Sequence, residues 1–450
     1  MKDYSAEYKS KLITAEQAAK MVKSGDWLEF GYGQSKPMAI DAELAKRKDE
    51  LFDVMVHSSA CYRPFKIFEN DRSGIHFRYL SGHCSVQERR FMEDGFGTYI
   101  PSMLGQNSEW MERGYRRVDV TMLSVCPMDK HGYFNFGPVG TFLKTCCDVA
   151  KIVIVEINDK MPRCLGGRDE AVHISEVDYI VEDPRASVKP EVLSSPEPDE
   201  VDRKIAEYIV EEIQDGSCIQ LGIGAMPNLV GTMIAESDLK DLGIHTEMFN
   251  TAMAKMVNAG KVTGRRKNID TGKVVYSFAL GTEEVYELID DNPMMAMFPC
   301  SYTNHVAVIM RNDRAVSINN CIEVDLTGQV ASESVGTKHI SGAGGQLEFA
   351  IGAYYAKEGK SFICLNSTHK TKDGKVSSRI KPILTPGAVV TTPRPCVNYL
   401  VTEYGKVNLK GKSMWDRAEM IISLAAPEFR DELVEEAKKL KLWTRTSKLV

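Results

Sequence analysis

The sequence lacks the long apolar segments and the excess of basic residues that two large classes of protein require. No apolar run in its 450 residues approaches the roughly 20 residues that a membrane-spanning helix needs. Its 62 acidic residues outnumber its 56 basic residues, and the formal net charge is −6. Nucleic acids and anionic membrane surfaces bind proteins through a cationic face. We therefore expect neither a nucleic acid nor a membrane as a partner.

Metal-binding and disulfide motifs are also missing. The 11 cysteines form no Cys-x-x-Cys pair, and Cys146 and Cys147 are adjacent, which suits neither a zinc site nor an ordinary disulfide. The nine histidines show no His-Glu-x-x-His spacing. The segment from Met1 to Glu7 lacks the apolar core of a signal peptide. Together these observations predict a cytoplasmic protein with free thiols and no metal site.

The common nucleotide-binding and hydrolase fingerprints are incomplete. The Gly-Lys-Ser triplets at 359–361 and 411–413 lack the glycine that a phosphate loop carries five positions before its second glycine. The Gly-x-Gly segments at 31–33 and 222–224 lack the third glycine of a dinucleotide fingerprint, and no Gly-x-Ser-x-Gly elbow occurs. Nucleotide hydrolase, dehydrogenase and serine hydrolase functions therefore have no support.

The composition is that of a globular protein, with 43% hydrophobic and 26% charged residues, and the length suits two or three domains. Prolines 184, 190, 196 and 198 favour an extended segment. This segment is the best domain boundary. We predict an N-terminal α/β domain at 1–186, a linker at 187–199 and a C-terminal α/β domain at 200–450.

The two halves share a local pattern of helix, glycine turn, short strand and Gly-x-Gly. Shifting residues 18–33 by 191 positions onto 209–224 places Gly25 on Gly216, Gly31 on Gly222 and Gly33 on Gly224. Elsewhere, candidate strands alternate with candidate helices. This alternation favours mostly parallel sheets with helices on both faces. The predicted fold class is therefore α/β, with two similar open α/β domains.

Particular segments of the sequence are predicted as the strands and helices of this α/β fold. Residues 14–17 have capping-box spacing and open the first helix. We expect strands at 27–31, 54–57, 118–126, 151–157, 218–222, 244–248 and 274–279. We expect further helices at 200–214, 227–235, 413–424 and 427–440.

Two glycine-rich segments and one glutamate are the candidate functional residues. The segment 222–228 reads as a loop between a strand and a helix, where backbone N–H groups can bind an anionic oxygen. The segment 341–346 has three glycines in four positions, which suits close approach of the backbone to a ligand. Glu247 ends a short strand, the edge at which open α/β sheets bind ligands. The alternative interpretation of 222–228 is a tight turn, that of 341–346 is a hairpin turn, and that of Glu247 is a solvated surface carboxylate.

Five segments in order give a more specific indication. They read GIGAMPN (222–228), GIHTEM (243–248), INNCIEVDLTGQVASESVGT (318–337), SGAGGQLEF (341–349) and TEYGKVNLKGKS (402–413). The chain resembles the family I coenzyme A (CoA) transferases, in the branch with 4-hydroxybutyrate CoA-transferase and butyryl-CoA:acetate CoA-transferase. The resemblance covers essentially the whole chain and is densest from Gly222 to Ser413.

The resemblance implies two α/β domains with the active site in the cleft between them. It implies that Glu247 is the catalytic glutamate and that acyl-CoA is the substrate. We expect the backbone N–H groups at Ile223, Gly344 and Gly345 to form the oxyanion hole. The expected CoA-binding residues are Gly224, Ala225, Met226, Pro227, Asn228, Ile322, Gly345 and Lys370.

The implied chemistry is ping-pong transfer of CoA through a glutamyl-CoA thioester, with a short-chain carboxylate such as acetate as the second substrate. It requires no metal and no tightly bound cofactor. A homo-oligomer is also implied. Two alternatives remain: a hydrolase, in which water replaces the acceptor acid, and a non-catalytic ligand-sensing module on the same fold. The sequence does not distinguish butyryl, propionyl and 4-hydroxybutyryl groups.

Overall fold

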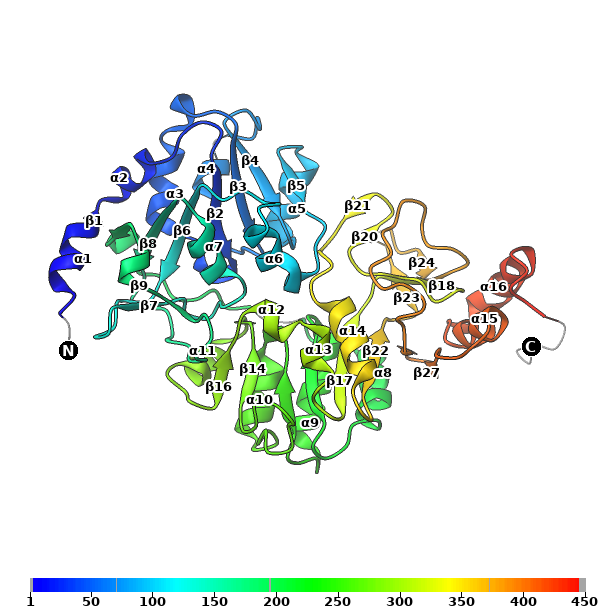
Figure 1. Cartoon of the computed structure of the whole chain (residues 1–450). Helices are drawn as coiled ribbons and strands as arrows, with labels where there is room; N and C mark the ends of the chain where they lie inside the picture. The colour runs from blue at the N-terminus through cyan, green and yellow to red at the C-terminus, as the bar shows by residue number, and fades with distance from the viewer. Residues whose placement is uncertain (1–2, 70, 194–195, 372, 445–450) are drawn as a thin grey trace. The chain divides into compact units, whose positions relative to one another are not determined.

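The chain folds into two compact units, which we describe separately. The computed structural model describes residues 3–69, 71–193, 196–371 and 373–444 (Figure 1). Unit 1 runs to Leu193 and also includes Glu247–Phe249 and Val275–Thr303. Unit 2 comprises the described residues of 194–246, 250–274 and 304–450. The second half of the chain thus contributes two segments to unit 1. The domain limits predicted from the sequence stay a prediction.

The first large sheet has eight strands, and every neighbouring pair in it is parallel. In spatial order they are β1 (Leu12–Ile13), β10 (Tyr179–Val181), β8 (Ile152–Ile157), β6 (Val120–Val125), β2 (Trp27–Tyr32), β3 (Val54–Ser59), β4 (Phe77–Ser81) and β5 (Gly97–Tyr99).

The second large sheet also has eight strands. In spatial order they are β16 (Met295–Met297), β14 (Val274–Tyr276), β12 (Gly243–His245), β11 (Cys218–Leu221), β17 (Ala315–Asn320), β22 (Lys360–Cys364), β26 (Tyr399–Thr402) and β27 (Gly405–Asn408). The pairs from β12 to β26 are parallel, whereas β26 and β27 form an antiparallel pair at the edge.

The two sheets share one topology. In the first sheet, β3, β4 and β5 extend one side of β2 in chain order, while β6, β8 and β10 extend the other. In the second sheet, β12, β14 and β16 extend one side of β11, while β17, β22 and β26 extend the other. The Gly-x-Gly segments at 31–33 and 222–224 therefore follow equivalent strands. The prediction of two similar open α/β domains with mostly parallel sheets is confirmed.

Helices connect the strands of both sheets (Figure 1). They are α1 (Ser5–Lys11), α2 (Ala15–Lys20), α3 (Met38–Ala45), α4 (Lys66–Glu69), α5 (Val86–Glu93), α6 (Asn107–Glu112), α7 (Leu143–Val149), α8 (Glu200–Val210), α9 (Ala225–Glu236), α10 (Thr251–Asn258), α11 (Glu283–Ile289), α12 (Cys300–Thr303), α13 (Val306–Ile309), α14 (Gln346–Tyr355), α15 (Met414–Ser423) and α16 (Pro427–Lys439). No helix in the described ranges is long and apolar enough to cross a membrane.

Short strands lie outside the two large sheets. They are β7 (Tyr133–Asn135), β9 (Ala171–His173), β13 (Met248–Phe249), β15 (Phe278–Ala279), β18 (Glu323–Asp325), β19 (Val330–Ala331), β20 (Ser334–Val335), β21 (Lys338–His339), β23 (Thr368–Lys370), β24 (Val376–Ser378) and β25 (Ile380–Lys381).

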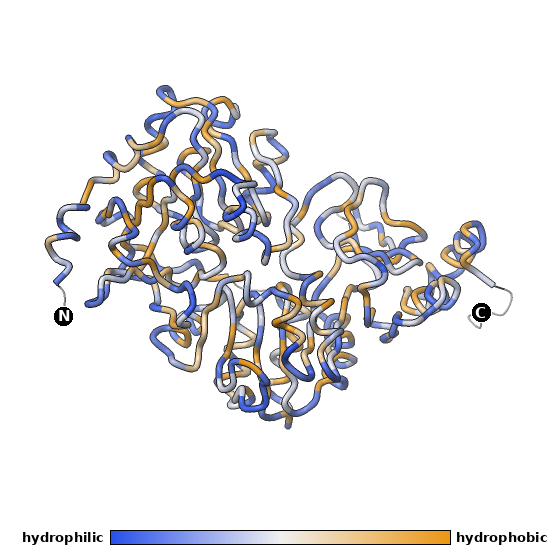
Figure 2. The backbone as a smooth tube through the Cα atoms, viewed as in Figure 1, coloured by the Kyte–Doolittle hydropathy of each residue, from blue (hydrophilic) through white to orange (hydrophobic). Residues whose placement is uncertain are grey.

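The sheet of unit 1 is covered by apolar side chains on both faces. Successive residues of one strand belong to different hydrophobic clusters: Met122 packs in one cluster and Leu123 in the other. Ile154 and Val155 alternate in the same way on β8. Figure 2 shows hydrophobic segments gathered in the interior of each unit. A strand buried on both faces has a nearly continuous apolar sequence, which is why residues 151–157 were recognisable as a strand.

Most predicted elements match, and two predictions of continuous strands are wrong. The capping box at the start of α2 is present, because Gln17 N donates to Thr14 Oγ1 at 3.1 Å and Thr14 N donates to Gln17 Oε1 at 2.8 Å. The predicted strand at 244–248 is not continuous, since β12 ends at His245 and β13 begins at Met248. The predicted strand at 274–279 is interrupted in the same way at Ser277.

Candidate active site

Glu247 lies in the break between β12 and β13. Its chain neighbours Thr246 and Met248 are buried, whereas Glu247 is half-buried. Its backbone carbonyl accepts hydrogen bonds from Ser277 N at 2.9 Å and from Phe278 N at 3.1 Å. The following residues pair in parallel with β15. The segment that contains Ser277 and Phe278 therefore fixes the backbone at Glu247, while the residue itself stays partly exposed.

The Tyr32 side chain, at the end of β2, lies within the electrostatic field of Glu247. Burial raises the pKa of Tyr32 well above its usual range, and the negative charge of Glu247 is the next cause. The ring packs against Phe278 with centroids 4.9 Å apart and against Phe142 at 6.1 Å. Tyr32 therefore remains protonated at neutral pH, and its hydroxyl can donate a hydrogen bond.

The loop at 222–224 connects β11 to α9 in unit 2. Gly222 N donates to Ile318 O on β17 at 2.8 Å. Gly224 has a φ of 131°, and a Cβ there would lie 2.9 Å from Asn320 Nδ2, so the position favours glycine. Between the two glycines, the Ile223 side chain is 48% exposed. The loop thus presents one exposed residue between two constrained glycines.

The first turn of α9 contains the other residues predicted in this loop. Gly224 is the N-cap, and Pro227 stands in the first turn, where its missing N–H costs no helix hydrogen bond. Gly224 has no side chain with which to cap the helix. The backbone N–H groups of a helix N-terminus are a suitable site for an anionic group.

A second loop lies next to 222–224, because β11 and β17 are parallel neighbours. Asn319, near the end of β17, exchanges two side-chain hydrogen bonds with Gln220, at 3.0 and 3.1 Å. Ile322 follows two residues after β17, and its N–H donates to Ala331 O at 2.9 Å. The structure thus brings the carboxyl-terminal ends of β11 and β17 together, as the CoA-binding prediction for 224–228 and Ile322 requires.

Gly344 and Gly345 lie at the N-terminus of α14, another helix of unit 2. Gly344 has a φ of 51°, and Gly345 is the N-cap. The carbonyl of Gly345 accepts a hydrogen bond from Phe349 N at 2.9 Å, which begins the helix. These two glycines and Ile223 therefore stand at the starts of different helices. Their role as oxyanion-hole donors stays a prediction.

Lys370 is exposed at the end of β23. Its neighbour His369 lines a cavity of about 260 Å³ in unit 2, together with Ile322, Arg379 and Lys381. Successive residues of a strand point to opposite faces, so Lys370 and His369 face different sides of the hairpin. Lys370 is not among the lining residues of this cavity.

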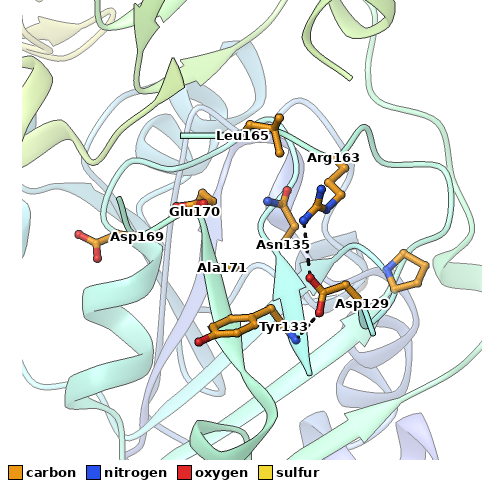
Figure 3. Close-up of a pocket in the computed structure, with 9 residues that line it drawn as sticks. Asp129, Tyr133, Asn135, Arg163, Leu165, Asp169, Glu170 and Ala171 are labelled. Atoms are coloured by element: carbon orange, nitrogen blue, oxygen red, sulfur yellow. Dashed lines mark hydrogen bonds and ion pairs between the residues drawn. The ribbon is translucent and has the colours of Figure 1, made fainter. Parts of the chain in front are cut away.

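A cavity of about 300 Å³ in unit 1 contains none of the predicted site residues (Figure 3). Its polar groups interact with one another. Arg163 forms an ion pair with Asp129 at 3.6 Å, and Asn135 Oδ1 accepts hydrogen bonds from Gly137 N and Cys164 N at 2.9 and 3.0 Å. In the part of the chain that the structure describes, no group of three His, Cys, Asp or Glu side chains could hold a metal ion.

Family models match both ends of the chain. The acetyl-CoA hydrolase/transferase N-terminal domain matches residues 1–190, and the C-terminal domain of the same name matches residues 281–437. The chain belongs to the acetyl-CoA hydrolase/transferase family. This membership confirms the family predicted from the five sequence segments.

Relatives within this family match over nearly their full lengths. A probable butyrate:acetyl-CoA coenzyme A-transferase from Syntrophomonas wolfei is 50% identical, over 98% of each chain. A butyryl-CoA:acetate CoA-transferase from Anaerostipes caccae is 47% identical, over 99% of this chain and 100% of the relative. The crystal structure of a 4-hydroxybutyrate CoA-transferase from Porphyromonas gingivalis covers 97% of this chain and 100% of its own, with a TM-score of 0.79 and 28% identity.

Sequence reasoning missed several residues that a member of this family could use. Tyr32 was noticed only as the middle of a Gly-x-Gly segment, and its place near Glu247 arises from contacts between distant parts of the chain. Arg379 and Lys381 were not singled out among 56 basic residues. Their spacing of two residues, either side of the apolar Ile380, was the available signal, because it places two cations on one face of a strand.

Proposed function

We propose that this chain is a CoA-transferase that moves CoA between a short-chain acyl-CoA and a carboxylate such as acetate. Butyryl-CoA and 4-hydroxybutyryl-CoA are the proposed acyl-CoA substrates, and Glu247 is the proposed catalytic residue. The observation that carries the proposal is the near-complete match to two butyrate CoA-transferases, in a chain that holds Glu247 in a hydrogen-bonded break beside β15.

The proposed reaction is ping-pong and begins at the carboxylate of Glu247. A carboxylate oxygen attacks the thioester carbonyl of acyl-CoA, the carbon–sulfur bond breaks, and CoA leaves as its thiolate with a mixed anhydride remaining. The thiolate then attacks the glutamyl carbonyl and releases the acyl group as a free carboxylate. Glu247 now carries a glutamyl-CoA thioester. An incoming acetate repeats these steps in reverse and leaves as acetyl-CoA.

Each attack produces a tetrahedral oxyanion, which backbone N–H groups can stabilise. We propose the N–H groups at Ile223, Gly344 and Gly345 for this role. Removing one such donor typically costs about 3–4 kcal/mol of transition-state stabilisation. The proposed CoA contacts are the first turn of α9 (224–228), Ile322, Gly345 and Lys370. The place of these residues at the N-terminus of α9 supports the first of these contacts, because backbone N–H groups there can receive an anionic group.

Trapping of the covalent intermediate tests this proposal. The protein is incubated with butyryl-CoA without acceptor and then treated with borohydride, which reduces a glutamyl thioester to an alcohol. Peptide mass spectrometry should find the modification on the peptide that contains Glu247. The Glu247→Gln variant, treated in the same way, should show none. An unmodified wild-type peptide after butyryl-, acetyl-, propionyl- and 4-hydroxybutyryl-CoA would rule out the covalent route.

Acetate dependence separates transfer from hydrolysis. A transferase consumes butyryl-CoA only when acetate is present and produces acetyl-CoA in equal amount. A hydrolase releases free CoA without acetate. Equal rates of butyryl-CoA consumption with and without acetate would replace the proposal with the hydrolase alternative.

We also propose a homo-oligomer in the cytoplasm. Family resemblance supports the first part, and the free cysteines support the second. Native mass spectrometry of the purified protein measures the number of subunits.

A further inference from the structure

The cavity of about 260 Å³ in unit 2 carries basic side chains from two strand pairs. Arg379 and Lys381 come from the segment around β25, which runs parallel to β18. Arg379 O accepts a hydrogen bond from Val324 N at 3.1 Å, which places this segment in register with β18. Ile380, between the two cations, is fully buried in the core. Because the two flanking side chains point to the opposite side, both reach the cavity.

The third basic side chain comes from the β23–β24 hairpin. His369 stands opposite Ser377, and its Nδ1 lies 3.1 Å from Ser377 Oγ. Burial is the largest cause that lowers the pKa of His369, and the positive charges of Arg379 and Lys381 follow. The imidazole is therefore neutral at pH 7. Arg379 and Lys381 are therefore the two cations that line the cavity beside His369.

The positive charge of this cavity is not cancelled by its one lining carboxyl group. Glu323 accepts hydrogen bonds from Thr385 N and Thr385 Oγ1, each at 2.8 Å. In the described ranges, neither Arg379 nor Lys381 forms an ion pair. Arg379 also acts weakly on Asp202, whose carboxyl accepts a hydrogen bond from Asp199 N at 3.2 Å. Two unpaired cations beside a cavity create a site for an anion.

We propose that this cavity binds a phosphate group of the CoA moiety, with the Arg379 guanidinium and the Lys381 ammonium as its cationic ligands. The proposal rests on the proposed function, since it concerns the same substrate. Ile322, an expected CoA contact, forms part of the cavity wall. CoA carries a 3′-phosphate and a 5′-diphosphate. Arginine suits either, because its planar fork can donate two parallel hydrogen bonds to phosphate oxygens.

The size of the cavity fits one part of CoA. Sites that enclose a whole drug-sized ligand have volumes of about 300–1,000 Å³. The cavity lies just below this range, so it accommodates a phosphate group and the atoms next to it. Hydrogen bonds to a charged group are roughly twice as strong as neutral ones. The cavity therefore contributes to the affinity for CoA without taking part in the chemical steps.

Three butyryl thioesters test the proposal with Arg379→Gln and Lys381→Gln. They are butyryl-CoA, butyryl-3′-dephospho-CoA and S-butyrylpantetheine, which carries no phosphate. With butyryl-CoA, each variant should raise KM about 10-fold and leave kcat nearly unchanged, as expected when one charge-assisted hydrogen bond is lost. With S-butyrylpantetheine, the variants and the wild type should have equal KM. Arg379→Lys, which keeps the charge, should recover part of the loss.

The dephospho substrate identifies which phosphate binds. If the KM difference disappears with butyryl-3′-dephospho-CoA, the cavity holds the 3′-phosphate. If the difference persists there and disappears only with S-butyrylpantetheine, the cavity holds the diphosphate. An equal rise in KM for all three thioesters, or no rise for any, overturns the proposal. The control is Lys375→Gln, which removes an exposed cation from the turn between β23 and β24 and should leave every KM unchanged.

Calorimetric binding separates a failure of this inference from a failure of the proposed function. CoA, 3′-dephospho-CoA and pantetheine are titrated into the wild type and into Arg379→Gln, without any acyl donor. Loss of affinity for CoA but not for pantetheine in the variant supports the phosphate site even if no acyl transfer is observed. Equal affinities of wild type and variant for CoA overturn the site even if the wild type is an active transferase.

Discussion

The two Gly-x-Gly turns stand at equivalent points of two similar sheets, yet different groups surround them. In unit 1, Ser35 Oγ accepts a hydrogen bond from Tyr32 N at 2.8 Å and donates one to Tyr32 O at 2.9 Å. The helix that follows, α3, is also capped internally. Met38 N, Ala39 N and Ile40 N all donate to the carboxyl group of Glu156, at 2.5, 2.9 and 2.9 Å.

The equivalent turn in unit 2 is built differently. Ile223 is exposed between its two glycines, and the N-cap of α9 is Gly224, which has no side chain. The same backbone device is therefore closed by side chains in the first copy, whereas in the second it exposes Ile223, which we propose as part of the ligand site. A repeated fold can thus carry function in one copy only, because function depends on the groups at the site rather than on topology.

The largest effect on activity should come from substitution of Glu247, which follows the Gly-x-Gly turn of unit 2 in the sequence. Glu247→Gln removes the proposed nucleophile and should lower kcat for CoA transfer by on the order of 10⁴-fold or more, since a nucleophile has no substitute in a covalent route. The thermal midpoint should change little, because glutamine has the same size and the backbone carbonyl keeps the hydrogen bonds from Ser277 N and Phe278 N. Steady-state kinetics and thermal unfolding measure both. Retained activity would mean that the carboxylate is not the acyl carrier.

A matched pair of glycine variants tests the two turns directly. Gly224→Ala introduces a Cβ 2.9 Å from Asn320 Nδ2 at a φ of 131°, so it should lower kcat/KM for butyryl-CoA by about 10²-fold through displacement of the α9 N-terminus. Gly33→Ala, at the equivalent position, has a φ of 52° and only an ordinary contact at 3.8 Å. It should cost about 1–2 kcal/mol of stability, with a much smaller effect on kinetics. Equal kinetic losses in both variants would remove the distinction between the turns.

The internal cap of unit 1 should make stability depend on pH. Burial raises the pKa of Glu156 to about 7, from an ordinary value of 4.5. Between these values the native state binds more protons than the unfolded state, so this group's contribution to stability is lost as pH rises through 7. The maximal slope is about 1.4 kcal/mol per pH unit. Glutamine does not ionise, so the Glu156→Gln variant lacks this pH-dependent contribution to stability.

Urea unfolding at pH 5 and pH 8 measures this effect. The stability advantage of the wild type over Glu156→Gln should shrink by up to about 3 kcal/mol from the lower pH to the higher. A constant difference would indicate that Glu156 is ionised throughout. It would also contradict the description of this cap as a buried carboxyl group that retains its proton.

The smallest effect should come from Tyr32, which belongs to the closed turn but lies near the nucleophile. Tyr32→Phe removes the hydroxyl that carries the elevated pKa and keeps the ring contacts with Phe278 and Phe142. We expect kcat to fall about 10-fold, the effect of one lost neutral hydrogen bond, with an unchanged thermal midpoint. An unchanged kcat would mean that the closed turn has no part in the reaction.

The fold was predictable wherever local patterns are strong. Apolar runs such as 151–157 revealed strands buried on both faces, and the spacing of Gly31, Gly33, Gly222 and Gly224 revealed the repeat. The break at Glu247 was not predictable, because it depends on hydrogen bonds from Ser277 and Phe278, about thirty residues further on, which no local spacing encodes.

The candidate site was predictable only in part, for the same reason. The loop at 222–228 and Ile322 were found from their sequence motifs, and the parallel pairing of β11 with β17 places them side by side. Arg379 and Lys381 reach the cavity only through the pairing of β25 with β18, which joins residues more than fifty positions apart. Charged residues are common on surfaces, so their types alone do not indicate a binding site.

Unit 1 contains two segments from the second half of the chain, Glu247–Phe249 and Val275–Thr303, and these delay its folding during synthesis. Met248, Phe278, Leu280 and Cys300 all pack in the same hydrophobic cluster as Phe134 and Leu143. A ribosome must therefore synthesise the chain to about residue 303 before that cluster can close. Until then, the first 193 residues expose apolar surface, a state prone to aggregation. Unit 1 is consequently expected to need the downstream chain, so a cut at the proline-rich segment should give an N-terminal fragment that is insoluble by itself and recovers when both fragments are co-expressed.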